Sequence, residues 1–332
     1  MADLAQIDIA PLFTDDSAAW RAVDRQVGQA LDREGGFVIV GFHEAKLLDA
    51  RCTTLLRFFD LDEAEKQALA VRSTNAEGPR IYRGYSAALS DDSWAHNEMF
   101  DIGPEAPTPG PALPGMEILA ETNVWPTREP LAGWRAAMQA YHRQMSRVSL
   151  AVMLSAGRAK GIDDRELQAR FEGGNSTLRL LNYPLPPKPL RVIDEEPDGE
   201  KQDGIALAAG RHTDGAGVSL LWQAQPGLQA QAPDGSWRDI PCLANSISVH
   251  LGDVLQIMTD GAVPATPHRV VDHGRARQSV GFFLEPALGA RLSAIDHGET
   301  EESESARGTY GWHLLRRLHS YSGNETLIPL PD

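Results

Sequence analysis

A histidine and an aspartate separated by one residue form the first candidate site in this sequence. His212 and Asp214 flank Thr213 in a segment typical of a strand end, and a second histidine, His268, follows later in the chain. Residues i and i+2 of a strand point to the same side, so His212 and Asp214 can converge on one atom. Two imidazoles and one carboxylate are the facial ligand set of non-haem Fe(II), which leaves three positions open for a bidentate cosubstrate and O₂.

These three residues alone are weak evidence. A His-x-Asp triplet is common by chance, and the chain has 10 histidines. His273 is the nearest rival to His268, but it lies in a turn-like segment, Asp272-His273-Gly274-Arg275. His250 is better explained as a buried core histidine than as a ligand. The prediction of a metal site therefore depends on the residues that follow His268.

An arginine and a serine after His268 indicate a carboxylate-binding site. With the period of two of a strand, Arg277, Ser279 and Phe283 share one face. A guanidinium with a hydroxyl beside it suits one carboxylate, held by two parallel hydrogen bonds. Tyr183 could donate its phenol to the same carboxylate, and Arg179 would share a face with Tyr183. A surface ion pair for Arg277 and a core position for Tyr183 are the alternatives.

We expect the helices and strands of the first part of the chain to hold these residues in position. Residues 1–60 are typical of an α/β lead-in, and residues 72–128 are mostly irregular, with a proline-rich stretch at 103–116. The expected elements are a helix over 17–34 capped by Ser17 and ended by Gly35-Gly36, a strand over 37–40, and helices near 44–58 and 62–71.

The second part changes from helix to strand. The spacing of apolar residues predicts a long helix over 129–160 with Pro130 in its first turn. Many short strands at close spacing then indicate an antiparallel sandwich or barrel. The expected strands are 177–183, 217–223, 227–232, 247–250, 254–259, 269–272 and 279–285, followed by a final helix over 310–321. Two acidic loops, 192–204 and 296–306, are interpreted as solvated insertions, with a role as lids as the alternative.

Composition and charge limit the function. The 332 residues, of which 42% are hydrophobic, are enough for a large core, and the net charge of −15 disfavours nucleic acid and anionic lipid as partners. Two distant cysteines, Cys52 and Cys242, favour a reducing compartment. The first residues lack the features of a signal peptide, and no apolar run is long enough to span a membrane. We expect a cytoplasmic protein, monomeric or weakly dimeric, that acts on a small molecule.

The ordered set of motifs resembles a known family. The sequence is similar, nearly end to end, to the isopenicillin N synthase-like branch of Fe(II)/2-oxoglutarate-dependent dioxygenases. The motifs that carry the resemblance are Gly35-Gly36-Phe37-Val38, Arg83-Gly84-Tyr85, Glu98-Met99-Phe100-Asp101, His212-Thr213-Asp214, Gly252-Asp253-Val254, Thr266-Pro267-His268-Arg269-Val270 and Arg277-Gln278-Ser279. Three positions depart from the usual pattern: Leu181, His250 and Met258 stand where relatives often have Asn, Asn and Trp.

The resemblance implies a mainly β fold with flanking helices: a double-stranded β-helix, or jelly-roll, core with a helical N-terminal region and a C-terminal helix. Residues 1–125 would form the N-terminal α/β region, and 126–332 the scaffold helix with the catalytic core, as one structural unit. The resemblance also implies a site. Its residues are His212, Asp214 and His268 for Fe(II), Arg277, Ser279, Tyr183 and Asn182 for 2-oxoglutarate, and Phe283, Arg179, Arg83, Tyr85 and Glu98 for the substrate.

The implied activity is oxidation, and we expect hydroxylation, of a small metabolite such as an amino acid, with release of succinate and CO₂. The reaction would be centred on the metal and would use O₂, with no separate acid or base. One alternative is an iron oxidase that needs no cosubstrate, as in isopenicillin N synthase, where the same arginine and serine have another use. The other alternative is a jelly roll that binds a ligand without catalysis.

Overall fold

Two β-sheets form the centre of the computed structural model, which describes residues 4–89, 96–106, 115–185, 206–295, 306–320, 324, 326–328 and 330. The larger sheet has, in spatial order, β1 (Gln6–Asp8), β2 (Phe37–Val40), β10 (Ile247–Leu251), β7 (Val218–Gln223), β12 (Arg277–Leu284), β5 (Thr177–Tyr183), β4 (Asn97–Ile102) and β3 (Tyr85–Ala88). The smaller sheet has β6 (Leu207–His212), β11 (His268–Val271), β8 (Leu228–Gln231) and β9 (Trp237–Asp239). Neighbouring strands are antiparallel, except that β1 and β2 are parallel.

Two groups of buried side chains hold the sheets and helices together. One group joins the two sheets face to face, with Leu181 and Tyr183 of the larger sheet against Ala209, Leu228 and Val270 of the smaller one. The second group lies on the other face of the larger sheet, where helices cover it. This arrangement confirms the predicted jelly-roll core with flanking helices. Strands from the first 102 residues complete the larger sheet at both of its edges.

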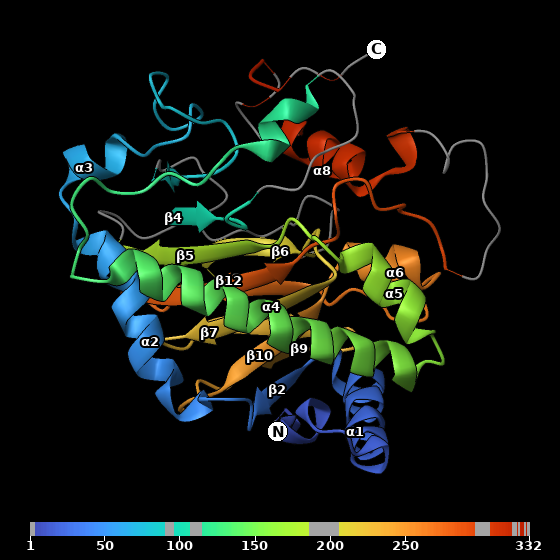
Figure 1. Ribbon diagram of the computed structural model, residues 1–332. Coiled ribbons are helices and arrows are strands. Elements are labelled where there is room, and N and C mark those ends of the chain that lie inside the picture. The colour runs from blue at the N-terminus through green and yellow to red at the C-terminus, as the bar shows by residue number, and fades with distance from the viewer. Residues whose placement is uncertain are drawn as a thin grey trace.

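The long helix α4 (Trp134–Ala159) lies across the covered face of the larger sheet (Figure 1). Its buried side chains recur at helical spacing and include Trp134, Met138, Tyr141 and Met145. The helix begins later than the sequence predicts, because Gly133 has a φ of +81° and so precedes the first helical residue. The remaining α-helices in the described part of the chain are α1 (Ser17–Glu34), α2 (Leu48–Leu55), α3 (Glu63–Gln67), α5 (Asp164–Phe171), α6 (Asp253–Met258) and α8 (Tyr310–His319).

Helix α1 has the predicted bounds, but its cap differs. The carboxylate of Asp16, rather than the side chain of Ser17, accepts hydrogen bonds from the backbone N–H groups of Ala18 and Ala19. Gly35 ends the helix with a φ of +72°. The turn at Gly35 leads into β2, which pairs with β10 and so ties the first part of the chain to the later strands of the larger sheet.

The expected strand over 254–259 is wrong, because this segment is helix α6. Val254, Leu255 and Met258 are buried, while Ile257 is 37% exposed, and this spacing fits a helix rather than a strand. A short apolar run does not distinguish the two structures by its periodicity. Strands β3, β4, β6 and β9 are not among the predicted elements, because they are short or carry polar residues.

The acidic loop at 192–204 and residues 296–305 of the second acidic loop lie outside the described residues. Among the helices that the structure describes, none is long and apolar enough to cross a membrane.

Candidate active site

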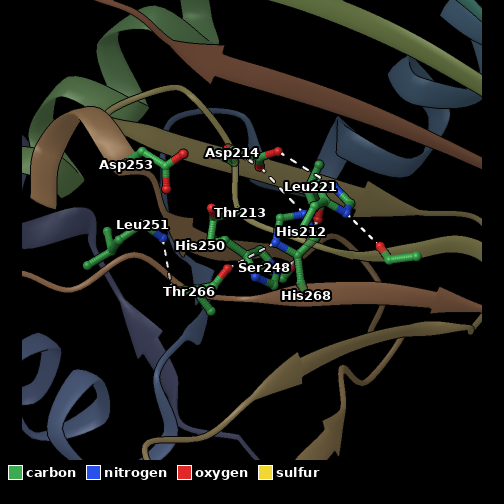
Figure 2. Close-up of polar contacts among 12 residues, drawn as sticks. His212, Thr213, Asp214, Leu221, Ser248, His250, Leu251, Asp253, Thr266 and His268 are labelled. Carbon is green, nitrogen blue, oxygen red and sulfur yellow. Dashed lines mark hydrogen bonds and ion pairs between the residues drawn. The ribbon is translucent and has the colours of Figure 1, made fainter. Parts of the chain in front are cut away.

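The two predicted histidine ligands lie opposite each other on neighbouring strands. His212 ends β6, His268 begins β11, and the two residues are paired in register. Asp214 follows β6 by two residues, and the three side chains gather at one point between the sheets (Figure 2). The distance between His212 Nε2 and Asp214 Oδ1 is 3.8 Å, and that between His268 Nε2 and Asp214 Oδ2 is 3.6 Å. Ligand atoms of all three residues lie within 4.8 Å of one another, which is close enough to share one metal ion.

Backbone carbonyl groups orient both imidazoles toward this point. His212 Nδ1 lies 2.8 Å from the oxygen of Gly210, and His268 Nδ1 lies 3.1 Å from the oxygen of Thr266. A carbonyl oxygen can only accept, so each Nδ1 carries a proton, and in the neutral ring Nε2 is then the nitrogen with the free lone pair. Histidines that ligate a metal through one ring nitrogen typically donate a hydrogen bond from the other. The donor set therefore fits a divalent iron.

The charges at this point also suit a cation. Burial lowers the pKa of His212 to about 4, so its imidazole is neutral at pH 7. Burial alone would raise the pKa of Asp214, but His268, His212 and a hydrogen bond from Ser219 together lower it to about 2. Ser219 Oγ donates to Asp214 Oδ2 at 2.5 Å and leaves Oδ1 facing His212. The cluster therefore offers two imidazole nitrogens, that of His212 neutral, and one negative oxygen.

His250 lies behind the pair of histidines and is not part of the cluster. Its ring centroid is 4.9 Å from that of His268, and its Nε2 lies 3.2 Å from Ser248 Oγ (Figure 2). The side chain is fully buried, and burial lowers its pKa to about 3. His250 therefore packs as a neutral ring against a predicted ligand.

Arg277 is a buried cation without a carboxylate partner in the described part of the chain. Its side chain donates to Ser279 Oγ at 3.3 Å and to Gln223 Oε1 at 3.1 Å, and its Nε has no partner there. The guanidinium lies 5.1 Å from the ring centre of Tyr183. Burying a guanidinium with neutral partners is costly, and a bound carboxylate would remove that cost. Burial also lowers the pKa of Arg277.

Three of the predicted residues lie on the other face of the larger sheet. Glu98 accepts hydrogen bonds from Tyr85 Oη at 2.6 Å and from Asn182 Nδ2 at 2.7 Å. It also forms an ion pair with Lys66 of α3 at 2.6 Å. Asn182 pairs with Gln278, which alternates with Arg277 along β12, so its side chain points away from Arg277. The contacts of Asn182, Tyr85 and Glu98 thus tie α3 to the sheet.

Arg179 and Phe283 share the face of Arg277 but lie nearer to the His212 cluster. Arg179 donates to both carboxylate oxygens of Asp101, at 2.8 and 2.7 Å, and its guanidinium lies 5.4 Å from the ring centre of Phe283. Phe283 is paired in register with Ser219, which contacts Asp214. Arg179 and Asp101 therefore place a charged pair on the inner face, one and two strands away from the strand of Phe283.

Arg83 lies deeper, in a buried polar group at the start of β5. Only 1% of Arg83 is exposed, and its guanidinium donates to Asn175 and Thr177. Thr177 Oγ1 in turn donates to Glu285 Oε2 at 3.1 Å. Burial raises the pKa of Glu285 to about 7, although the nearby Arg83 opposes the shift.

Several residues of the site were not predicted. Ser219 and Gln223 alternate with apolar residues along β7, and this polar pattern on one strand face could have revealed them. Glu285 and Arg317 carried no such signal, because their partners are far away in the sequence.

The fold and the site together define an iron- and 2-oxoglutarate-dependent oxygenase. The profile of the 2OG-Fe(II) oxygenase superfamily matches residues 175–286, and that of the non-haem dioxygenase in morphine synthesis N-terminal region matches residues 4–128. The chain belongs to the isopenicillin N synthase-like family of Fe(II)/2-oxoglutarate-dependent dioxygenases.

Individual relatives are distant. Isopenicillin N synthase of Streptomyces clavuligerus is 27% identical and aligns over 96% of this chain and 95% of its own. The structure of a full-length Neurospora crassa protein in complex with alpha-KG and thymine has a TM-score of 0.71 at 23% identity, over 95% of this chain and 96% of that one. JOX2 in complex with 2OG, Fe and JA has a TM-score of 0.67 at 22% identity, over 99% of this chain and 90% of that one. The two structural likenesses show a shared fold.

Proposed function

We propose that His212, Asp214 and His268 hold Fe(II) and that the protein hydroxylates a small organic molecule. The observation that carries this proposal is the pair of Nε2 lone pairs turned toward Asp214 by backbone carbonyls. Bound iron and 2-oxoglutarate would supply the activation of O₂, with release of succinate and CO₂. The chain's own part is to present three ligand atoms that would hold the metal and to keep the imidazole of His212 neutral.

We assign the distal carboxylate of 2-oxoglutarate to Arg277 and Ser279, with Tyr183 beside them. The buried, unpaired guanidinium supports this assignment, because one carboxylate would satisfy its free Nε–H and its charge together. Gln223 holds the other side of the guanidinium and fixes its plane. Asn182 is left out of this assignment because its hydrogen bonds lie on the other face of the sheet.

We place the substrate against Phe283 and the Arg179–Asp101 pair. One third of the Arg179 side chain (33%) is exposed, whereas Arg83, Tyr85 and Glu98 are buried and engaged in hydrogen bonds. A charged pair beside an aromatic ring suits a small molecule with both a polar and an apolar part, such as an amino acid. The thymine and JA in the complexes of the structural relatives are also small molecules.

A cosubstrate-free oxidase is the second candidate, and the isopenicillin N synthase relatives favour it. In that case Arg277 would hold a carboxylate of the substrate. Succinate formation separates the two candidates, because the second one produces none.

The test measures succinate after incubation of the protein with Fe(II), 2-oxoglutarate, O₂ and a panel of amino acids. We expect succinate above the iron-free background, stimulated by at least one amino acid and abolished in His212→Ala. His43→Ala is the matched control, since 85% of this histidine's side chain is exposed and it lies outside the cluster. Iron-dependent activity that persists in His212→Ala would refute the metal assignment.

The two cysteines bear on the cellular compartment of the protein. The structure has two free cysteines, Cys52, which is buried, and Cys242. Unpaired cysteines support a reducing compartment, and we propose a cytoplasmic protein on this ground.

A further inference from the structure

A pocket of about 550 Å³ lies beside α4, on the face of the larger sheet that the helices cover. Its walls come from α4, from the residues after β4 and from the segment between α5 and β5. We call it the α4 pocket. Its volume is within the range of about 300–1,000 Å³ that is typical of small-molecule sites.

The α4 pocket is separate from the iron site. Ile102 and Leu284 line it, and they alternate with Asp101 and Phe283, whose side chains lie on the inner face. Successive residues of a strand point to opposite faces, so the sheet itself divides the two spaces. A ligand in the α4 pocket would therefore not compete with 2-oxoglutarate.

The lining of the α4 pocket has two chemically different parts. Ile102, Leu150, Phe171 and Leu284 provide an apolar floor. Arg143 and Arg147 stand one helical turn apart at the rim, exposed, and neither has an ion-pair or hydrogen-bond partner within the described ranges.

The other polar residues orient a ligand. His142 is buried, its Nε2 is bound to the carbonyl oxygen of Ser176 at 3.0 Å, and Glu105 lies close enough to raise its pKa, which burial lowers. Glu105 also lines the pocket and would repel a second negative group. A single anionic group would thus lie at Arg143 and Arg147, with the apolar body on the floor.

We propose that the α4 pocket binds a small amphiphilic monoanion, such as an aromatic or aliphatic carboxylate or sulfonate, as a second ligand distinct from 2-oxoglutarate and substrate. Two residues that line the pocket, Phe171 and Leu284, also contact Gly217 in the loop that follows Asp214. A β-carbon on Gly217 would come within 2.6 Å of the Phe171 ring, and the Gly217 N–H donates to the Leu284 carbonyl oxygen at 2.8 Å. The ligand would therefore rest on residues that support the iron site from behind.

The experiment uses the fluorescent probe 1-anilinonaphthalene-8-sulfonate, which has one anionic group on an aromatic body. The full-length protein is saturated with Fe(II) and 2-oxoglutarate under anaerobic conditions and titrated with the probe. We expect saturable binding of one probe per chain, at the same Kd with and without Fe(II) and 2-oxoglutarate. In Arg143→Glu/Arg147→Glu the Kd should rise by about tenfold or more.

Two further variants separate the parts of the proposal. Ser146→Phe fills the pocket without changing its charge and should also weaken binding. Arg21→Glu/Arg25→Glu is the matched control, because these exposed arginines have the same spacing on α1 and give the same change in net charge. Displacement of the probe by Fe(II) with 2-oxoglutarate would overturn the proposal. The proposal would also be overturned if the probe showed no saturable binding, or if its Kd rose equally in Arg21→Glu/Arg25→Glu.

Discussion

Arg317 of the C-terminal helix donates a hydrogen bond of 2.7 Å to the backbone carbonyl of Thr213, the residue between His212 and Asp214. Its other terminal nitrogen lies 2.9 Å from Asp253 Oδ2. The backbone N–H of Asp253 in turn donates to the carbonyl oxygen of Asp214 at 2.8 Å. Helices α6 and α8 therefore fix the loop that follows His212 and carries Asp214, two of the proposed iron ligands.

Loss of this contact should weaken iron binding without unfolding the protein. In Arg317→Gln the loop around Thr213 loses its anchor, and changes to groups that position ligands typically cost about 10- to 100-fold in metal affinity. Anaerobic titration with Fe(II) should show a Kd at least about tenfold higher. Arg316→Gln is the control, since this neighbour is exposed. Equal affinities in the two variants would remove Arg317 from this positioning role.

Replacement of Arg277 should impair the use of 2-oxoglutarate more than the binding of iron. Arg277→Gln removes the charge that faces the proposed carboxylate, and such buried pairs are worth about 2 kcal/mol or more, or about 30-fold. We expect the KM for 2-oxoglutarate to rise by at least that factor, with little change in the Kd for Fe(II). Arg238→Gln, which loses an ion pair with Asp234 on the hairpin, should leave both constants unchanged. An unaltered KM in Arg277→Gln would exclude the assignment.

Glu98 should matter for stability. Glu98→Ala leaves Lys66, whose side chain is 10% exposed, without its buried partner, and this should lower the free energy of unfolding by about 3 kcal/mol. Glu63 also pairs with Lys66, but it is 63% exposed, so Glu63→Ala should cost about 1 kcal/mol or less. Urea denaturation measures both. If Glu98→Ala instead changed the KM for a substrate at unchanged stability, Glu98 would belong to the active site.

His142 should make stability fall in acid. Burial lowers the pKa of His142 to about 4, against about 6.5 in the unfolded chain. Between these values the unfolded chain takes up a proton that the folded protein does not, so the free energy of unfolding decreases as the pH falls from about 7 to about 4. His142 contributes about 3 kcal/mol to this decrease.

His142→Gln tests this contribution, because the amide can still donate to the carbonyl of Ser176. Its urea midpoints should fall less steeply than those of the wild type between pH 7 and pH 4. His43→Gln is the control, since 85% of the His43 side chain is exposed. Parallel pH profiles for the wild type and His142→Gln would contradict the shifted pKa.

The sequence predicted the site best where residue types that can bind a metal coincide with the period of two of a strand. His212, Asp214 and His268 come together as predicted because His212 and His268 are paired at the ends of two strands and Asp214 follows His212 by two residues. Asn182 shows the limit of the same reasoning. It follows Leu181 and precedes Tyr183, so the alternation of β5 directs its side chain away from Arg277.

Other features depend on contacts between distant segments. Tyr85 and Glu98 lie in motifs of the family, but the partner of Glu98, Lys66 on α3, could not be identified from local pattern. The same holds for the short run at 254–259, where tertiary packing chose a helix. Arg317 and Thr213 are brought together by the path of the C-terminal helix over the loop.

The most direct test of the central claim is anaerobic absorption spectroscopy of the apo-protein with Fe(II) and then 2-oxoglutarate. If His212, Asp214 and His268 hold iron and Arg277 receives the distal carboxylate, a weak visible charge-transfer band should appear when both components are present. The band should be absent in Asp214→Ala, and Arg277→Gln should require far more 2-oxoglutarate to reach it. If the wild-type protein binds Fe(II) but gives no band with 2-oxoglutarate, the assignment of the cosubstrate site is contradicted.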